Sequence, residues 1–269
     1  MSERITIKVE DGVADVRLVR EDKMNALDDA MFARLISAAE EINADKTIRC
    51  VVLSGQGRAF CAGLDMGNFA KMAEGKRSEN SVAGGGLAAR TYGIANRAQQ
   101  AVWGWRTLRV PVIAAVHGVA LGGGFQVMLG ADIRIVHPDT KLSILEVKWG
   151  LVPDMSSTAI MRRLVREDII RELTYTGRMF SGVEGKEYGF VTHVSETPHE
   201  DAMALAREIA SKSPSAVQTA KKLYNHIADK DDGEALLTES VLQEELMGTK
   251  NQIEAVMAGL QKRAGNFAD

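Results

Sequence analysis

HGVALGGGFQ, residues 117–126, is the stretch of this sequence that decides how the chain folds. It follows an apolar run at 112–116 that is typical of a buried strand, and it leads into a short helix through Leu129. Three consecutive glycines are costly in backbone entropy. They therefore indicate either tight packing of chain against chain or backbone N–H groups that are left available to bind a ligand. The start of a helix favours developing negative charge. We expect a strand–turn–helix unit, with close helix–sheet contact as the structural alternative.

A second glycine turn, GRAFCAGLD at residues 57–65, is placed in the same way. It follows an apolar strand expected at 50–53, so it lies at the carboxyl end of that strand, where open α/β sheets bind ligands. Gly63 permits a close approach that a Cβ would block, and the N–H of Leu64 could then point into a cleft. Alone, this pattern is weak, because a glycine after a strand more often forms only an ordinary turn. The run Gly122 to Gly124 lacks the G-x-G-x-x-G spacing of a dinucleotide site.

The regular pattern outside these turns predicts two regions. Alternating strand and helix signals run through residues 1–197 and favour a layered α/β core, whereas 198–269 is helical throughout. Within the first region, an apolar helical stripe is expected at Ile94, Ala98, Val102 and Trp105. The glycine-rich segment 67–93 is either a lid over a binding site or a variable surface insertion.

Composition limits the function further. The 269 residues are 45% apolar and 26% charged, with a net charge of −3, which gives no case for nucleic acid as a partner. No apolar stretch approaches the ~20 residues of a membrane span, and the N-terminus has no signal-peptide pattern. Cys50 and Cys61 are the only cysteines, so neither a zinc site nor a disulfide framework is expected. We predict a cytoplasmic protein without a metal.

Four segments together resemble the crotonase family, also called the enoyl-CoA hydratase/isomerase superfamily. They are KMNAL at 23–27, GRAFCAGLD at 57–65, PVIAAVHGVALGGGFQ at 111–126 and GLVPDM at 150–155. Their order and spacing are similar to the family's over essentially the whole chain. The resemblance implies a crotonase-like spiral of repeated ββα units followed by a helical trimerisation region at 198–269. It also implies an acyl-CoA thioester substrate, no cofactor beyond that CoA, and a homotrimer or hexamer.

The resemblance also assigns residues to the site. It implies that the backbone N–H groups of Leu64 and Gly123 form an oxyanion hole. It places CoA contacts at Met24, Ala26, Ala62, Leu64, Asp65, Met66 and Gly123. Such donors suit the chemistry because removing a proton beside a thioester puts negative charge on its oxygen, and one fixed donor stabilises that charge by roughly 3–4 kcal/mol.

The proton-transfer groups depart from the hydratase pattern. Hydratases of the family use two glutamates, and here those positions hold Gln126 and Glu146. An amide can orient a water but cannot accept a proton near neutral pH. One base is enough to move a double bond from the 3,4 to the 2,3 position, because it can take a proton from C2 and return it to C4. The sequence therefore favours a Δ3,Δ2-enoyl-CoA isomerase over an enoyl-CoA hydratase, with Glu146 as general acid/base.

Three alternatives stay open. Asp154, eight residues after Glu146, stands where the family's dienoyl-CoA isomerases carry an aspartate, or it is simply a loop or helix-capping residue. Glu146 itself could be an ordinary ion-pair partner of Lys148 or of another neighbour. The remaining hypothesis is that the protein binds acyl-CoA but does not catalyse a reaction. His117 is expected to make a local hydrogen bond, and Cys61 to be buried and unreactive.

Overall fold

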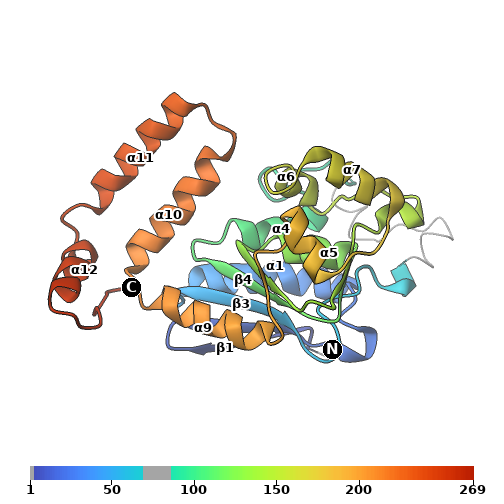
Figure 1. Ribbon diagram of the computed structural model, residues 1–269, viewed down its shortest axis with the longest axis horizontal. Helices are drawn as coiled ribbons and strands as arrows, with labels where there is room; N and C mark the ends of the chain where they lie inside the picture. The colour runs from blue at the N-terminus through green and yellow to red at the C-terminus, as the bar shows by residue number, and fades with distance from the viewer. Residues whose placement is uncertain (1–2, 69–85) are drawn as a thin grey trace.

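The computed structural model describes residues 3–68 and 86–269, and within them the core is a six-stranded sheet (Figure 1). Its order is β1-β2-β3-β4-β6-β8, in which β1 and β2 form an antiparallel hairpin and the later neighbours are parallel. The strands are β1 (Ile5–Glu10), β2 (Val13–Leu18), β3 (Cys50–Gly55), β4 (Val112–Val116), β6 (Ile133–Val136) and β8 (His193–Val194). A separate parallel pair joins β5 (Val119–Leu121) to β7 (Lys141–Ser143).

Strand β3 shows why the sheet is covered on both faces. All six of its residues are buried, and the first four alternate between two apolar clusters. Val51 and Leu53 join the larger cluster, which contains residues of α1 (Asp29–Ala44), α4 (Arg97–Arg106) and α5 (Gly123–Leu129). Cys50 and Val52 join the cluster under α9 (Pro198–Ala210), which packs across β2, β3, β4 and β6. A continuous apolar run is thus the signature of a strand with helices on either side.

Local sequence explains where the helices start. The Asp28 side chain accepts a hydrogen bond from the Met31 N–H at 2.8 Å, which caps α1. Asn96 and Gln99 form a reciprocal capping box at the start of α4. This cap corrects one expectation: Ile94 lies before the helix and is 75% exposed, so it is not part of the buried stripe. Val102 and Trp105 are fully buried, as predicted.

Four short helical segments lie between β7 and β8 along the chain. These are the 3₁₀ turn η2 (Glu146–Trp149), α6 (Ser157–Met161), α7 (Glu167–Thr176) and α8 (Gly182–Tyr188), while η1 (Glu21–Lys23) follows the first hairpin. Residues 69–85, the centre of the segment expected to be a lid or insertion, lie outside the described residues.

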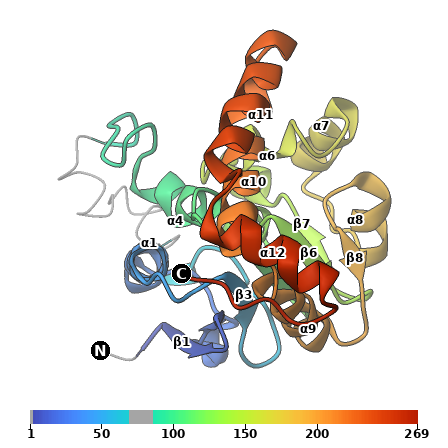
Figure 2. The ribbon, with the colours of Figure 1, turned by 90° about the vertical axis from the view of Figure 1, so that its left-hand side faces the viewer.

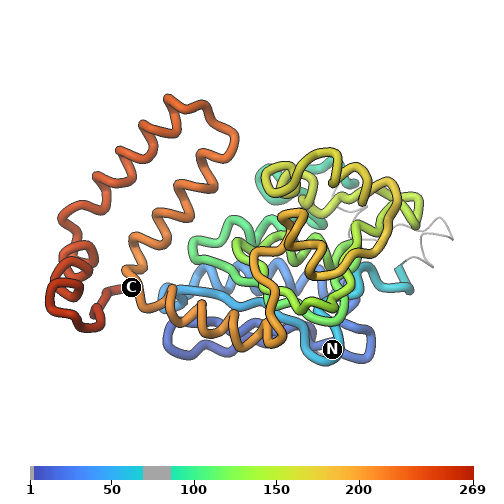
Figure 3. Tube along the Cα trace, viewed as in Figure 1, coloured from blue at the N-terminus to red at the C-terminus, as the bar shows by residue number. Residues whose placement is uncertain are grey.

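The last helices form an arm that extends away from the sheet (Figures 1 and 2). The arm comprises α10 (Pro214–His226), η3 (Ile227–Asp229), α11 (Asp232–Leu246) and α12 (Lys250–Leu260). Figure 3 shows the chain turning at α12 so that its C-terminus returns beside the start of α10. The buried Lys221 links α10 to the core, because its Nζ lies 2.7 Å from an Asp132 carboxylate oxygen.

Candidate active site

The N–H of Leu64 is oriented by a short parallel ladder between two turns. The Leu27 N–H donates to the Gly63 carbonyl at 2.8 Å, and the Asp65 N–H donates to the Leu27 carbonyl at 3.1 Å. In a parallel ladder the residue between two such partners directs its own N–H to the opposite side. The Leu64 N–H accordingly has no acceptor among the described residues. It is an available donor on the face away from Leu27.

Gly123 supplies a second available N–H. It is the first residue of α5, so its N–H has no partner within the helix, and no acceptor for it lies in the described part of the chain. A Cβ on Gly123 would lie 2.8 Å from Leu27 Cδ1 and 3.0 Å from Met155 Sδ. Glycine therefore gives the backbone here a space that any other residue would partly fill.

The two glycine turns are held against each other. The Leu121 N–H donates to the Cys61 carbonyl at 3.1 Å, within a parallel bridge that joins Cys61 to Ala120. Gly63 has a φ of +87°, and a Cβ there would lie 2.5 Å from the Leu121 carbonyl oxygen and 3.5 Å from the Gly123 nitrogen. The structure thus brings the two predicted donors, Leu64 and Gly123, to adjacent turns.

The predicted CoA-contacting residues also converge. The Ala62 N–H donates to the Met24 carbonyl at 2.9 Å, which places these two segments side by side. The Arg20 guanidinium donates to the Ala26 carbonyl at 2.9 Å and to the Asp65 carboxylate at 2.7 Å. Met66, next in the chain, is 64% exposed. Both segments therefore present backbone and side chains along one edge of the site.

Asn25 holds this edge together, and the sequence reasoning missed it. Its side chain is fully buried, accepts from the Arg20 N–H at 2.8 Å, and donates to the carbonyls of Gln56 and Ala59 at 3.0 and 2.8 Å. Its φ is +56°, a region that asparagine tolerates better than most residues. An asparagine within the predicted CoA-contacting turn was the available signal.

Gln126 and Glu146 form the centre of the site. The Gln126 Nε2 donates to Glu146 Oε1 at 2.6 Å, so the two family positions are in direct contact. The Gln126 Oε1 accepts from the Met155 N–H at 2.8 Å and from the Ser157 hydroxyl at 2.7 Å. Gln126 is 1% exposed and Ser157 is likewise 1% exposed. Ser157 was not predicted as a site residue, because it lies 31 residues from its partner.

Glu146 has one satisfied and one unsatisfied oxygen. Its Oε2 is buried and has no hydrogen-bond partner among the described residues, although a carboxylate normally accepts several bonds. Burial raises the pKa of Glu146, and the nearby Asp154 carboxylate raises it further, against the lowering effect of the Gln126 hydrogen bond. Lys148 does not pair with Glu146 but lies over the Trp149 ring, at 5.6 Å from its centroid. The ion-pair alternative for Glu146 is therefore wrong.

Asp154 lies in the loop before α6 and does not cap that helix, whose first flanking residue is Ser156. The Asp154 side chain is solvent-exposed, yet the protein around it partly excludes water and raises its pKa. Asp154 acts on Glu146 through its charge. It is therefore part of the electrostatic surroundings of the site.

Other candidate groups make no reactive centre. His117 Nε2 lies 2.8 Å from the Gly57 carbonyl oxygen, which fits the expected local hydrogen bond. Burial raises the pKa of the Cys61 thiol to about 12, so the thiolate is not formed near neutral pH. Across residues 3–68 and 86–269, no group of His, Cys, Asp or Glu side chains is arranged to hold a metal ion. No helix in the same ranges is long and apolar enough to cross a membrane.

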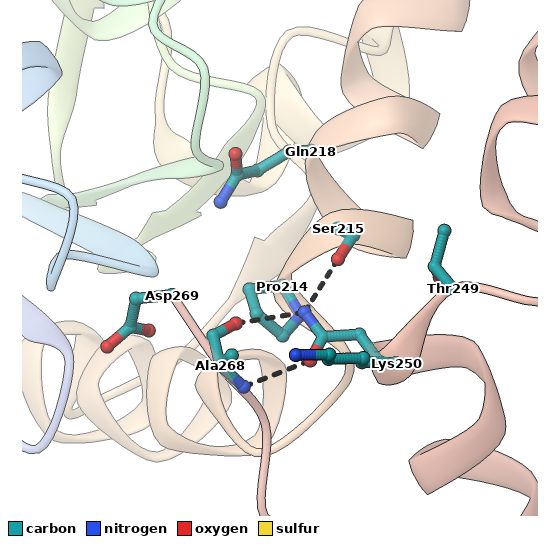
Figure 4. Close-up of a pocket in the computed structure, with 8 residues that line it drawn as sticks. Pro214, Ser215, Gln218, Thr249, Lys250, Ala268 and Asp269 are labelled. Carbon is teal, nitrogen blue, oxygen red and sulfur yellow. Dashed lines mark hydrogen bonds between the residues drawn. The ribbon is translucent and has the colours of Figure 1, made fainter.

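A pocket of about 290 Å³ lies elsewhere, between the starts of α10 and α12 and the C-terminal residues (Figure 4). The Asn251 amide donates to the Ala268 carbonyl and accepts from the Ala268 N–H, each at 2.9 Å. None of the predicted site residues lines this pocket. It belongs to the packing of the arm and the chain end, away from Glu146.

Comparisons with known proteins agree with this geometry. A family model described as enoyl-CoA hydratase/isomerase matches residues 8–269. The chain is 30% identical, over 95% of its length and 87% of the relative's, to a mitochondrial Delta(3,5)-Delta(2,4)-dienoyl-CoA isomerase of Dictyostelium discoideum. It is 31% identical, over 94% of its length and 91% of the relative's, to the enoyl-CoA hydratase EchA19 of Mycobacterium tuberculosis.

The solved structures are similar over almost the full chain. An enoyl-CoA hydratase from Bacillus anthracis superposes with a TM-score of 0.88 at 30% identity, covering 98% of this chain and 99% of that one. A shared fold over this length confirms the predicted α/β core with a helical C-terminal region.

Proposed function

Since the chain belongs to the enoyl-CoA hydratase/isomerase family, we propose that it moves the double bond of a 3-enoyl-CoA to the 2,3 position, with Glu146 as the single general acid/base. One observation carries this proposal: the buried, unpartnered Glu146 Oε2 has an amide beside it and not a second acid. An amide leaves one proton carrier at the centre of the site.

The proposed reaction needs only that carrier. Glu146 Oε2 takes a proton from C2, and the electrons of the broken C–H bond delocalise into a dienolate whose negative charge rests on the thioester oxygen. The N–H groups of Leu64 and Gly123 stabilise that oxygen. The same proton then returns from Oε2 to C4, which restores the carboxylate and leaves the 2,3 double bond. The raised pKa of Glu146 makes it a stronger base than an exposed glutamate.

Hydration is less well supported because Gln126 has little capacity left for a water. Its oxygen already accepts from Met155 and Ser157, and one of its two amide hydrogens is bound to Glu146. The thioester supplies the electronic activation, so we also propose that no metal or cofactor beyond the substrate's CoA takes part.

The direct test compares 3-enoyl-CoA and 2-enoyl-CoA as substrates of the purified protein. We expect the isomerisation to be faster than hydration, and Glu146→Gln to abolish it. Glu187→Gln, which changes an exposed glutamate on α8, is the matched control and should retain full activity. Rapid hydration of 2-enoyl-CoA that survives Glu146→Gln would contradict both the reaction and the base.

Isomerisation of a 3,5-dienoyl-CoA is the second candidate, favoured by the charge of Asp154 beside Glu146. It predicts turnover of that substrate and its loss in Asp154→Asn, with a smaller change in 3-enoyl-CoA turnover. A silent acyl-CoA-binding protein would turn over neither substrate. It would also fail to exchange the α-hydrogens of a saturated acyl-CoA with ²H₂O.

We further propose a homotrimer, paired into a hexamer, in which the arm contacts neighbouring copies. The arm exposes apolar side chains in the single chain, including Leu236, Leu237, Ile253 and Leu260, each at least half exposed. Such a surface favours association with other copies. A monomer in sedimentation at micromolar concentration would contradict this. Both cysteines are free and buried, which fits the reducing cytoplasm that we propose as its location.

A further inference from the structure

The orientation of the Gln126 amide is fixed from its far side. The Met155 N–H can only donate, and it points at one end of the amide at 2.8 Å. That end must be the oxygen, and Ser157 adds two more donors to it, its hydroxyl at 2.7 Å and its backbone N–H at 3.4 Å. The NH2 group is thereby directed at Glu146 Oε1. Reversing the amide would set two N–H donors against each other and an oxygen against a carboxylate oxygen.

A fixed NH2 group at Oε1 has a consequence for the two oxygens of Glu146. Oε1 accepts a hydrogen bond from the Gln126 NH2 group, which disfavours protonation of Oε1. Oε2 is buried and has no hydrogen-bond partner among the described residues, so it is the oxygen that is free to carry the proton. If the amide could turn over once Glu146 was protonated, the proton could move to Oε1 and bond to the amide oxygen. It would then be stored away from the substrate. The donors on the far side of Gln126 oppose that reversal.

We propose that Ser157 is a positioning residue which locks the Gln126 amide, so that the proton taken from the substrate stays on Oε2 of Glu146 and can be returned. This inference rests on the proposed function for its role in turnover, but the lock itself is a property of three side chains in contact. Among the described residues, Ser157 makes no hydrogen bond to the thioester donors or to the CoA-contacting segments. Its effect should therefore fall on proton transfer and not on substrate binding.

Ser157→Ala removes the hydroxyl donor, and Ser156→Ala is a matched control. The neighbouring Ser156 hydroxyl donates to the Gln99 carbonyl at 3.2 Å and does not touch Gln126. For Ser157→Ala we expect kcat on 3-enoyl-CoA to fall roughly three- to tenfold, the range for losing one hydrogen bond, with KM unchanged. Deuterium placed at C2 should reach C4 less often, because a misplaced proton has longer to exchange with water. Ser157→Thr, which keeps the hydroxyl, should restore transfer.

A double-substitution cycle separates positioning from general packing. Gln126→Met removes the amide at similar volume, and in that background Ser157→Ala should have no further effect on kcat. An equal loss in both backgrounds, or a change confined to KM, would overturn the proposal.

One measurement tests the effect of Ser157 on the Gln126 amide without requiring turnover. Carbon-13 NMR of carboxyl-labelled glutamate follows the titration of Glu146, whose resonance is the one missing from Glu146→Gln. The Gln126 hydrogen bond lowers the pKa of Glu146, while burial and the Asp154 carboxylate raise it. Ser157→Ala should weaken that bond and move the midpoint upward, and Ser156→Ala should not. If Ser157→Ala shifts the Glu146 midpoint but the wild type is inactive on 3-enoyl-CoA, only the proposed function is overturned. If the wild type is active but Ser157→Ala leaves the midpoint unchanged, the proposed role of Ser157 is overturned.

Discussion

Replacing Gln126 by glutamate would recreate the acid pair that this site lacks. The new side chain could still accept from Met155 and Ser157, so its position should be kept. The contact with Glu146 would change in kind, because a donor at 2.6 Å from Oε1 becomes a second carboxyl oxygen at that distance. Two oxygens this close must share a proton if they are not to repel.

The magnitude follows from that distance. Two unit charges 2.6 Å apart repel by about 6 kcal/mol at an effective dielectric constant of about 20. Burial disfavours both charges further. The pair should therefore retain one proton at neutral pH. Because the folded state then holds a proton that the unfolded state releases at lower pH, this contribution to stability is fully present below the unfolded pKa. It is lost as pH rises through the folded pKa of the pair.

Two assays check Gln126→Glu. Thermal unfolding across pH should show the variant losing stability relative to wild type as pH rises, whereas Gln126→Met, which adds no acid and only removes the hydrogen bond to Glu146, should show a smaller slope. Hydration of 2-enoyl-CoA should increase, because one carboxyl can now donate while the other accepts. A flat difference in stability would refute the geometric reasoning. A normal stability slope with unchanged hydration would show that pocket geometry, and not the missing acid, limits hydration.

Three other substitutions test separate parts of the site. Glu146→Gln should raise the melting temperature at neutral pH, since burial disfavours the charged form, and the gain should disappear as pH falls and Glu146 becomes protonated. Asn25→Ala removes three hydrogen bonds and leaves alanine at a positive φ, so it should lower the free energy of unfolding by about 3–4 kcal/mol in a denaturant titration. Gly63→Ala places a Cβ 2.5 Å from the Leu121 carbonyl oxygen at φ +87°, so calorimetry should show weaker binding of a saturated acyl-CoA. Unchanged affinity would mean that this turn does not contact the thioester.

The sequence predicted those parts of the fold whose signal is local. The apolar run at 50–53 indicated the strand β3, and the periodic stripe through Val102 and Trp105 indicated a helix, because such patterns act within a few residues. Ile94 was misplaced because it continued the helical period, while the capping box at Asn96 started the helix later. The glycine turns were informative because few other residues fit their backbone.

The contacts that define the site were harder to predict, because they join residues distant in sequence. The family resemblance pointed to Gln126 and Glu146, but nothing in the sequence gave the orientation of the amide or its contact with Ser157. Asn25 carried only a weak signal, that of an asparagine in a turn. Hydrogen bonds of this kind depend on the finished packing of several elements, which periodicity does not report.

An amide beside a carboxylate simplifies the protonation of the site. A pair of acids titrates jointly, so neither has a protonation state of its own. With Gln126 neutral, Glu146 shares no proton with that neighbour, and its pKa is raised by burial and by the charge of Asp154 and lowered by hydrogen bonds from the backbone and from Gln126. A single base that must take a proton and return it benefits from this arrangement, because the side chain in hydrogen-bond contact with it cannot take up the proton. Hydration, which divides proton transfer between two groups, does not. Glutamine in place of a glutamate at position 126 therefore both removes one acid and suits Glu146 to a reaction that needs only one base.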